Sequence, residues 1–136
     1  IVPLSTAANV GAQLVELLRE NQILTLVADR DLTGRGVVVE MFGAPMRLPA
    51  GPAYLSLSTG TPLSVCAVFT TPTGWHTVIG PPVQIERSGV MREDVAALTK
   101  VIAAGFERYI ASAPPDWHMF QPAWEEDAGG APRSDA

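Results

Sequence analysis

The 136-residue sequence predicts an α/β domain with buried parallel strands, and three observations support this prediction. A short apolar run at residues 1–4, a helical pattern at 6–20 and a second apolar run at 23–28 form one strand–helix–strand unit. The second run is short and rich in branched residues, as strands covered on both faces are. An amphipathic pattern at residues 91–112 adds a long helix.

The first helix is expected because apolar residues recur on one helical face after Thr6, which can cap its start. That face comprises Val10, Leu14, Leu17 and Leu18. Residues 29–36 then form a loop rich in charge and glycine, where the strand at 23–28 ends. Ligands collect at such strand ends in open α/β sheets. Residues 37–41 read as another strand, and residues 43–45 turn the chain out of it.

A short helix is expected at residues 52–59, because Pro52 suits the first helical position and Gly60 suits the left-handed residue after the last one. Residues 62–69 form the next predicted strand. After a turn at residues 72–74, the weaker strand candidates are residues 75–79 and 83–85.

The helix at residues 91–112 is expected because apolar side chains recur every three or four positions along it. These side chains are Val95, Leu98, Ile102, Phe106 and Tyr109. Pro114 and Pro115 end the helix, and an apolar but aperiodic segment follows at residues 116–124. We expect one domain over residues 1–127 and a disordered polar tail over residues 128–136.

Composition limits the classes of partner. Hydrophobic residues make up 47% of the chain and charged residues 17%, so some apolar surface is expected to meet a partner. The net charge is −5, of which −2 belongs to residues 1–124, and this balance argues against nucleic acid. No window resembles a membrane-spanning helix. The start at Ile1, without a signal sequence, suggests a segment of a longer protein.

Several kinds of site are excluded by residue type. Cys66 is the single cysteine, so an internal disulfide and a cysteine zinc site are impossible, and we expect no metal. Cys66 also lies within a predicted buried strand, and with only His76 and His118 as further candidates a nucleophilic triad is not expected. The pair Gly34 and Gly36 lacks the third glycine of a dinucleotide fingerprint.

Charged residues near the strand ends allow two interpretations each. Asp29, Arg30 and Asp31 could contact a ligand, or they could form a structural ion-pair loop. Glu40 interrupts an apolar strand, so it either faces solvent or has a partner that offsets the cost of burying a carboxylate. Arg47 is either an ordinary loop arginine or a contact for phosphate, which a guanidinium binds through two parallel hydrogen bonds.

The aromatic residues near the end of the chain also allow two interpretations. Trp117, Phe120 and Trp124 could form a belt at a membrane surface, or they could attach the terminus to the core.

Four motifs in order resemble the C-terminal half of the lipid A late-acyltransferase family. They are ADRDLTGRGV at residues 28–37, EMFG at 40–43, PAGPA at 49–53 and DWHMFQPAW at 116–124. The last looks most like the mycobacterial branch that acts on phosphatidylinositol mannosides. The resemblance runs over nearly all of residues 1–127.

The resemblance implies the C-terminal half of a glycerolipid-acyltransferase-like fold, with a mixed, largely parallel sheet flanked by helices. It implies an enzyme peripheral on the cytoplasmic face of the plasma membrane, which moves an acyl chain from acyl-coenzyme A to a mannose hydroxyl of a phosphatidylinositol mannoside. Acyl-coenzyme A is a co-substrate, and no cofactor is expected. The partners would be these two substrates, the inner-leaflet surface and the missing N-terminal half.

The family's catalytic base is a histidine followed five positions later by an acid. Neither histidine here has such an acid, so we expect the base upstream and this chain alone to be inactive. The resemblance places Glu40 near the catalytic centre, and Arg30, Asp31 and Arg47 at the substrate. The competing class is a soluble α/β module that binds a ligand or a protein without catalysis.

Overall fold

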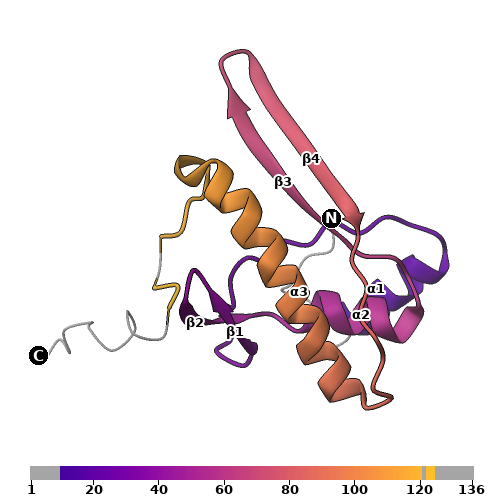
Figure 1. Cartoon of the computed structure of the whole chain (residues 1–136). Coiled ribbons are helices and arrows are strands. Elements are labelled where there is room, and N and C mark those ends of the chain that lie inside the picture. The colour runs from indigo at the N-terminus through magenta and orange to yellow at the C-terminus, as the bar shows by residue number, and fades with distance from the viewer. Residues whose placement is uncertain (1–9, 121, 125–136) are drawn as a thin grey trace, which may run out of the picture.

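The computed structural model describes residues 10–120 and 122–124, and Figure 1 shows its arrangement. The described residues form three α-helices, two β-hairpins and one 3-10 turn. In chain order these elements are α1 (Val10–Arg19), β1 (Val37–Met41), β2 (Ala44–Leu48), α2 (Gly51–Thr59), β3 (Ser64–Thr71), β4 (Gly74–Pro82), α3 (Met91–Ser112) and the turn η2 (Pro114–Asp116).

All three predicted helices are present where the structure describes them. α3 has the predicted bounds, and its stripe of apolar residues faces the core. α2 begins one residue before the predicted start, with Pro52 in its first turn and Gly60 left-handed at φ 72° after its end. The expected strand at residues 1–4 and the expected tail at residues 128–136 lie outside the described residues.

The largely parallel sheet is a wrong prediction for the described residues, because both sheets are antiparallel pairs: β1 with β2, and β3 with β4. Residues 23–28, which were expected to be a strand, form neither a helix nor a strand and pair with no described strand. The weak candidate at residues 83–85 is not a strand either, although the Val83 N–H donates a hydrogen bond to the Leu63 carbonyl at 2.8 Å.

The hairpin of β1 and β2 was only half predicted. Residues 44–48 form a strand rather than a turn and loop, because the chain reverses earlier, at Phe42 and Gly43. Both residues have positive φ, 54° and 76°. Two consecutive positive φ values belong to the turn whose twist matches that of paired strands, and glycine suits it far better than phenylalanine does.

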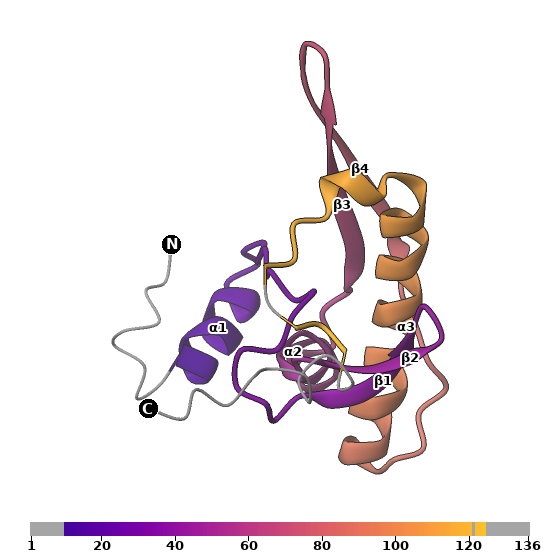
Figure 2. The ribbon, with the colours of Figure 1, turned by 90° about the vertical axis from the view of Figure 1, so that its left-hand side faces the viewer.

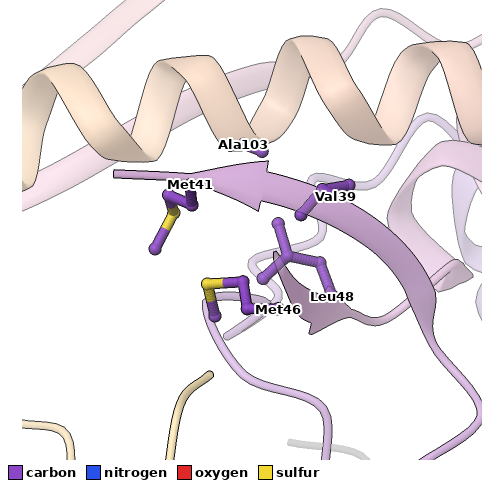
Figure 3. Packing of buried hydrophobic residues seen from close by; sticks show 5 residues of the cluster. All are labelled: Val39, Met41, Met46, Leu48 and Ala103. Atoms are coloured by element: carbon purple, nitrogen blue, oxygen red, sulfur yellow. The ribbon is translucent and has the colours of Figure 1, made fainter. Parts of the chain in front are cut away.

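The core lies along α3, which packs on both hairpins and on α2. Figure 2 shows α3 beside the β1–β2 hairpin, with α2 seen nearly end-on and the tip of the β3–β4 hairpin projecting beyond the helices. One apolar cluster consists of Val39, Met41, Met46, Leu48 and Ala103, gathered where α3 crosses β1 (Figure 3). The second consists of Ala53, Val65, Val95, Leu98 and Ile102.

Phe106 of α3 contacts both clusters, so one helix holds the two parts of the core together. Across the part of the chain that is described, no helix combines the length and the apolar character that crossing a bilayer requires.

Candidate functional site

The outer face of the β1–β2 hairpin carries two of the predicted site residues, Glu40 and Arg47. Side chains alternate along a strand, so the burial of Val39 and Met41 turns Glu40 to the opposite face, where it is exposed. Arg47 is paired directly with Val38, which places it on the same outer face and diagonally across from Glu40. This outer face is therefore where β1 and β2 present charge.

Glu40 thus follows the solvent-facing alternative. It makes no hydrogen bond or ion pair with any residue that the structure describes. An exposed carboxylate without such contacts is not needed to hold this hairpin together.

Asp31 organises the loop that leads into β1. Its Oδ1 accepts hydrogen bonds from the Thr33 N–H at 2.8 Å and the Thr33 hydroxyl at 2.7 Å. Its Oδ2 accepts one from the Gly36 N–H at 2.5 Å. The guanidinium of Arg47 donates to the Gly36 carbonyl at 3.2 Å, which ties the loop to β2. The structure therefore brings Asp31 and Arg47 together through Gly36.

The contacts of Asp31 determine the pKa of its carboxyl group. Burial raises the pKa of Asp31, but the hydrogen bonds from Thr33 and Gly36 and the positive charge of Arg47 outweigh burial and lower that pKa below its ordinary value. Asp31 is therefore ionised at neutral pH. These contacts give Asp31 and Arg47 a structural role whether or not they also touch a ligand.

The other two charged residues of the loop have different surroundings. Arg30 is exposed, and none of the hydrogen bonds described for Asp31 involves it. Asp29 accepts a hydrogen bond from the indole N–H of Trp117 at 3.0 Å, so it fixes the end of the chain rather than pairing with Arg30.

A second carboxylate network, which the sequence analysis missed, lies at the start of α3. Asp94 is only 1% exposed and accepts hydrogen bonds from the Arg87 guanidinium and the Ser88 N–H, both at 2.7 Å. Arg87 also reaches the Leu57 carbonyl of α2 at 3.5 Å. The signal in the sequence was an acid in the first turn of a helix, preceded by an arginine seven residues earlier.

The contacts of Asp94 predict a dependence of stability on pH. The hydrogen bond from Arg87, followed by that from Ser88, lowers the pKa of Asp94 despite its burial. A carboxyl whose pKa is lower in the folded state stabilises the fold above its unfolded pKa of about 4, and this stabilisation is lost as the pH falls toward the folded pKa.

We expect Asp94→Asn to lower the melting temperature at pH 7 by several degrees and to cost clearly less at pH 3, which lies below the unfolded pKa of about 4, so that part of the stabilisation by the carboxylate is already lost. Thermal unfolding at both pH values is the measurement. The control is Glu93→Gln, an exposed neighbour in the same helical turn. Equal losses at pH 7 and pH 3 would contradict the prediction.

The aromatic residues at the end of the chain divide between the two interpretations. The rings of Trp117 and Trp124 pack edge to face, with their centroids 6.0 Å apart. Both tryptophans also pack against the cluster that contains Met41 and Met46. The Trp124 indole N–H donates to the Met41 carbonyl at 3.0 Å. The two tryptophans therefore attach the terminal segment to the core, whereas Phe120 is 87% exposed.

Cys66 is exposed on β3, so the prediction that it lies in a buried strand is wrong. β3 is covered by α3 on one face only, the face of Val65, and Cys66 lies on the other. Neither histidine is placed as a base with an acid: the His118 ring nitrogen lies 3.2 Å from the backbone carbonyl of Asp116, and His76 stacks on Phe69.

Two apolar cavities lie between residues 23–29 and β3. The larger, about 420 Å³, also touches α2, and the smaller, about 260 Å³, extends toward Trp117. The charged outer face of the β1–β2 hairpin does not line either cavity.

The chain belongs to the bacterial lipid A biosynthesis acyltransferase family, whose model matches residues 5–126. The resemblance drawn from the four sequence motifs is thereby confirmed.

Three curated relatives share one name, phosphatidylinositol mannoside acyltransferase. Two are from Mycobacterium tuberculosis, strains CDC 1551 / Oshkosh and ATCC 25618 / H37Rv, each 41% identical over 121 residues. These matches cover 89% of this chain and 37% of each relative. The third, from Mycolicibacterium smegmatis, is 41% identical over 114 residues, 84% of this chain and 36% of the relative. The chain thus spans just over a third of the length of these relatives.

Proposed function

We propose that this chain is the C-terminal part of an enzyme that transfers a long acyl chain from acyl-coenzyme A to a mannose hydroxyl of a phosphatidylinositol mannoside. The observation that carries the proposal is the 41% identity to phosphatidylinositol mannoside acyltransferases over 89% of the chain. The reaction joins the hydroxyl oxygen to the acyl carbon, breaks the carbon–sulfur bond and releases coenzyme A as the thiol.

The acceptor hydroxyl must lose its proton as it attacks the thioester, and a neutral imidazole is suited to take it. His76 and His118 are not placed for this task, since one stacks on Phe69 and the other faces a backbone carbonyl. The proposal therefore assigns the base to a part of the enzyme outside this chain. The 136 residues alone would be inactive.

The outer face of the β1–β2 hairpin is the part of this chain that the proposal places at the reacting groups. Glu40 is exposed there, so its carboxylate can orient the base or the acceptor hydroxyl without losing a structural contact. Arg47 and Arg30 are the proposed contacts for phosphate groups of the substrates, and Asp31 holds the loop between them.

The proposal also places the enzyme peripherally on the cytoplasmic face of the plasma membrane, where its lipid acceptor resides. Large apolar side chains are exposed outside the core, among them Phe120, Leu32 and Phe42. Exposed apolar groups of this kind bind an interface by burial without crossing it.

The test measures thiol release from palmitoyl-coenzyme A, with mannosylated phosphatidylinositol in anionic vesicles, for the whole enzyme and for residues 1–136 alone. We expect turnover and cosedimentation with the vesicles for the whole enzyme, and no turnover for the isolated chain. Comparable turnover by the isolated chain would refute the assignment of the base to another part. Absence of turnover by the whole enzyme, with binding of the glycolipid retained, would favour a non-catalytic binding module.

A further inference from the structure

The indole N–H groups of Trp117 and Trp124 bond to the two ends of one stretch of the chain, residues 29–41. The Trp117 N–H donates to Oδ2 of Asp29 at 3.0 Å, and the Trp124 N–H donates to the Met41 carbonyl oxygen at 3.0 Å. In Figure 2 the chain after α3, coloured orange to yellow, returns from the end of that helix to the β1–β2 hairpin. The last described residues thus attach to the stretch that leads into β1 and forms it.

This stretch holds proposed site residues next to both points of attachment. Asp29 directly precedes Arg30, and Met41 directly follows Glu40. Each indole therefore bonds to the neighbour of a residue that the proposed function places at the reacting groups or the substrates. An apolar anchor for the chain end would need only the aromatic rings, whereas these two directed hydrogen bonds both go to the ends of the site stretch.

The two rings form one packed unit. They meet edge to face at an interplanar angle of 86°. Both rings are partly buried and pack against the cluster that contains Met41 and Met46. A further contact fixes the start of the segment, since the Asp116 carboxylate accepts a hydrogen bond from the Thr70 N–H at 3.0 Å. The spacing of the two attachment points is therefore set by packed aromatic rings.

The tryptophans do not lie on the face where the chemistry is proposed. The cluster that they contact is on the inner face of the β1–β2 hairpin, whereas Glu40 is exposed on the outer face. Trp124 acts on Glu40 through the backbone, because it holds the Met41 carbonyl where the strand turns into Phe42. Phe42 has a φ of 54°, which is unfavourable for phenylalanine, so a bond that fixes this peptide group supports the turn beside Glu40.

We propose that Trp117 and Trp124 are positioning residues, which hold Glu40 at a fixed place relative to the loop at residues 29–36. This inference rests on the proposed function, because that function assigns Glu40 to the reacting groups. Misplacing a group in an active site by about 1 Å can cost about 100-fold in rate. One lost hydrogen bond that lets the end of β1 shift is therefore enough to lower turnover.

Trp124→Phe in the whole enzyme removes the N–H donor and keeps an aromatic ring. We expect kcat for thiol release to fall about 5- to 50-fold, with KM for palmitoyl-coenzyme A changed by less than about twofold. In an enzyme that already carries Glu40→Gln, the same substitution should lower kcat by less than about twofold, because the group that it positions is gone. An equal loss in both backgrounds, or no loss of kcat in the first, would overturn the proposal.

The matched control is Trp75→Phe, at the third tryptophan of the chain. Trp75 is 75% exposed on β4 and makes no hydrogen bond with a described residue. We expect its kcat to equal that of the wild type. A loss as large as that of Trp124→Phe would show that replacing any tryptophan slows the enzyme, which would also overturn the proposal.

Hydrogen–deuterium exchange of Trp117→Phe tests the other end of the stretch without an activity assay. The N–H groups of Thr33 and Gly36 bond to Asp31, in the loop that begins at Asp29. We expect both amides to exchange at least about fivefold faster than in the wild type, since the loop then lacks one of its attachments. Unchanged exchange would show that Trp117 does not hold the loop.

These measurements separate the two proposals. If the whole enzyme does not release thiol from palmitoyl-coenzyme A, the proposed function fails, and faster exchange in Trp117→Phe still supports the attachment of the loop. If the wild type turns over but Trp124→Phe and Glu40→Gln lower kcat independently, the proposed function stands and the positioning role is refuted. If Trp124→Phe does not fold, the same pair of backgrounds is compared with Trp117→Phe.

Discussion

Replacing Glu40 with glutamine in the whole enzyme is expected to lower kcat by about ten- to a thousandfold, the scale of losing one positioned polar group in a transition state. The melting temperature should not change. Glu40 is exposed and makes no hydrogen bond or ion pair with a described residue, so its charge contributes little to folding. Turnover and thermal midpoint are measured on one preparation.

The matched control is Glu86→Gln, which removes the same charge from an exposed position in the connector before α3. We expect its kcat to equal that of the wild type. A rise in KM for the glycolipid at constant kcat would show that Glu40 only binds the acceptor. Unchanged kcat and KM for Glu40→Gln would show that the outer face of the hairpin lies away from the chemistry.

Gly36→Ala is expected to be among the most destabilising small substitutions in this chain. A Cβ added at Gly36 would clash with the Leu48 carbonyl oxygen and would lie 2.7 Å from Oδ2 of Asp31. The first contact is with backbone, and relieving the second breaks the hydrogen bond from the Gly36 N–H. Overpacking of this kind costs about 1–3 kcal/mol, and we expect the melting temperature to fall by roughly 5–10 °C.

Gly11→Ala controls for the general effect of replacing a glycine. No atom lies within 4 Å of a Cβ at Gly11, and its place inside α1 favours alanine by up to about 1 kcal/mol. The two substitutions should therefore move the melting temperature in opposite directions. A melting temperature of Gly36→Ala equal to or above that of the wild type would show that the approach of residue 36 to β2 is not tight in solution.

Features with a local cause were predictable from the sequence. α2 follows from Pro52 and Gly60, and α3 follows from the spacing of Val95, Leu98 and Ile102, because helix ends and helix faces depend on residues a few positions apart. The family was likewise accessible, since its motifs are short and occur in order.

Features that depend on distant or absent partners were not predictable. β2 was read as a loop because Pro45 and Arg47 are poor strand residues, and only the reversal at Phe42, unfavourable for its residue type, places them in a strand. Residues 23–28 were expected to be a buried parallel strand but pair with no described strand. At the candidate site, sequence identified the charged residues but not their contacts: Asp31 and Arg47 meet through Gly36, a neighbour of neither.

The attachment of Trp124 to β1 and β2 bears on how the chain folds as it is synthesised. Trp124 bridges to Met46 and bonds to the Met41 carbonyl, 83 positions earlier in the chain. The hairpin can form as soon as residue 48 leaves the ribosome, yet Met41 and Met46 stay without the two tryptophans until residues 117–124 have emerged. Synthesis proceeds at about 5–20 residues per second, so the face of the hairpin that carries Met41 and Met46 stays uncovered for several seconds. Chaperones can bind this apolar face during that interval.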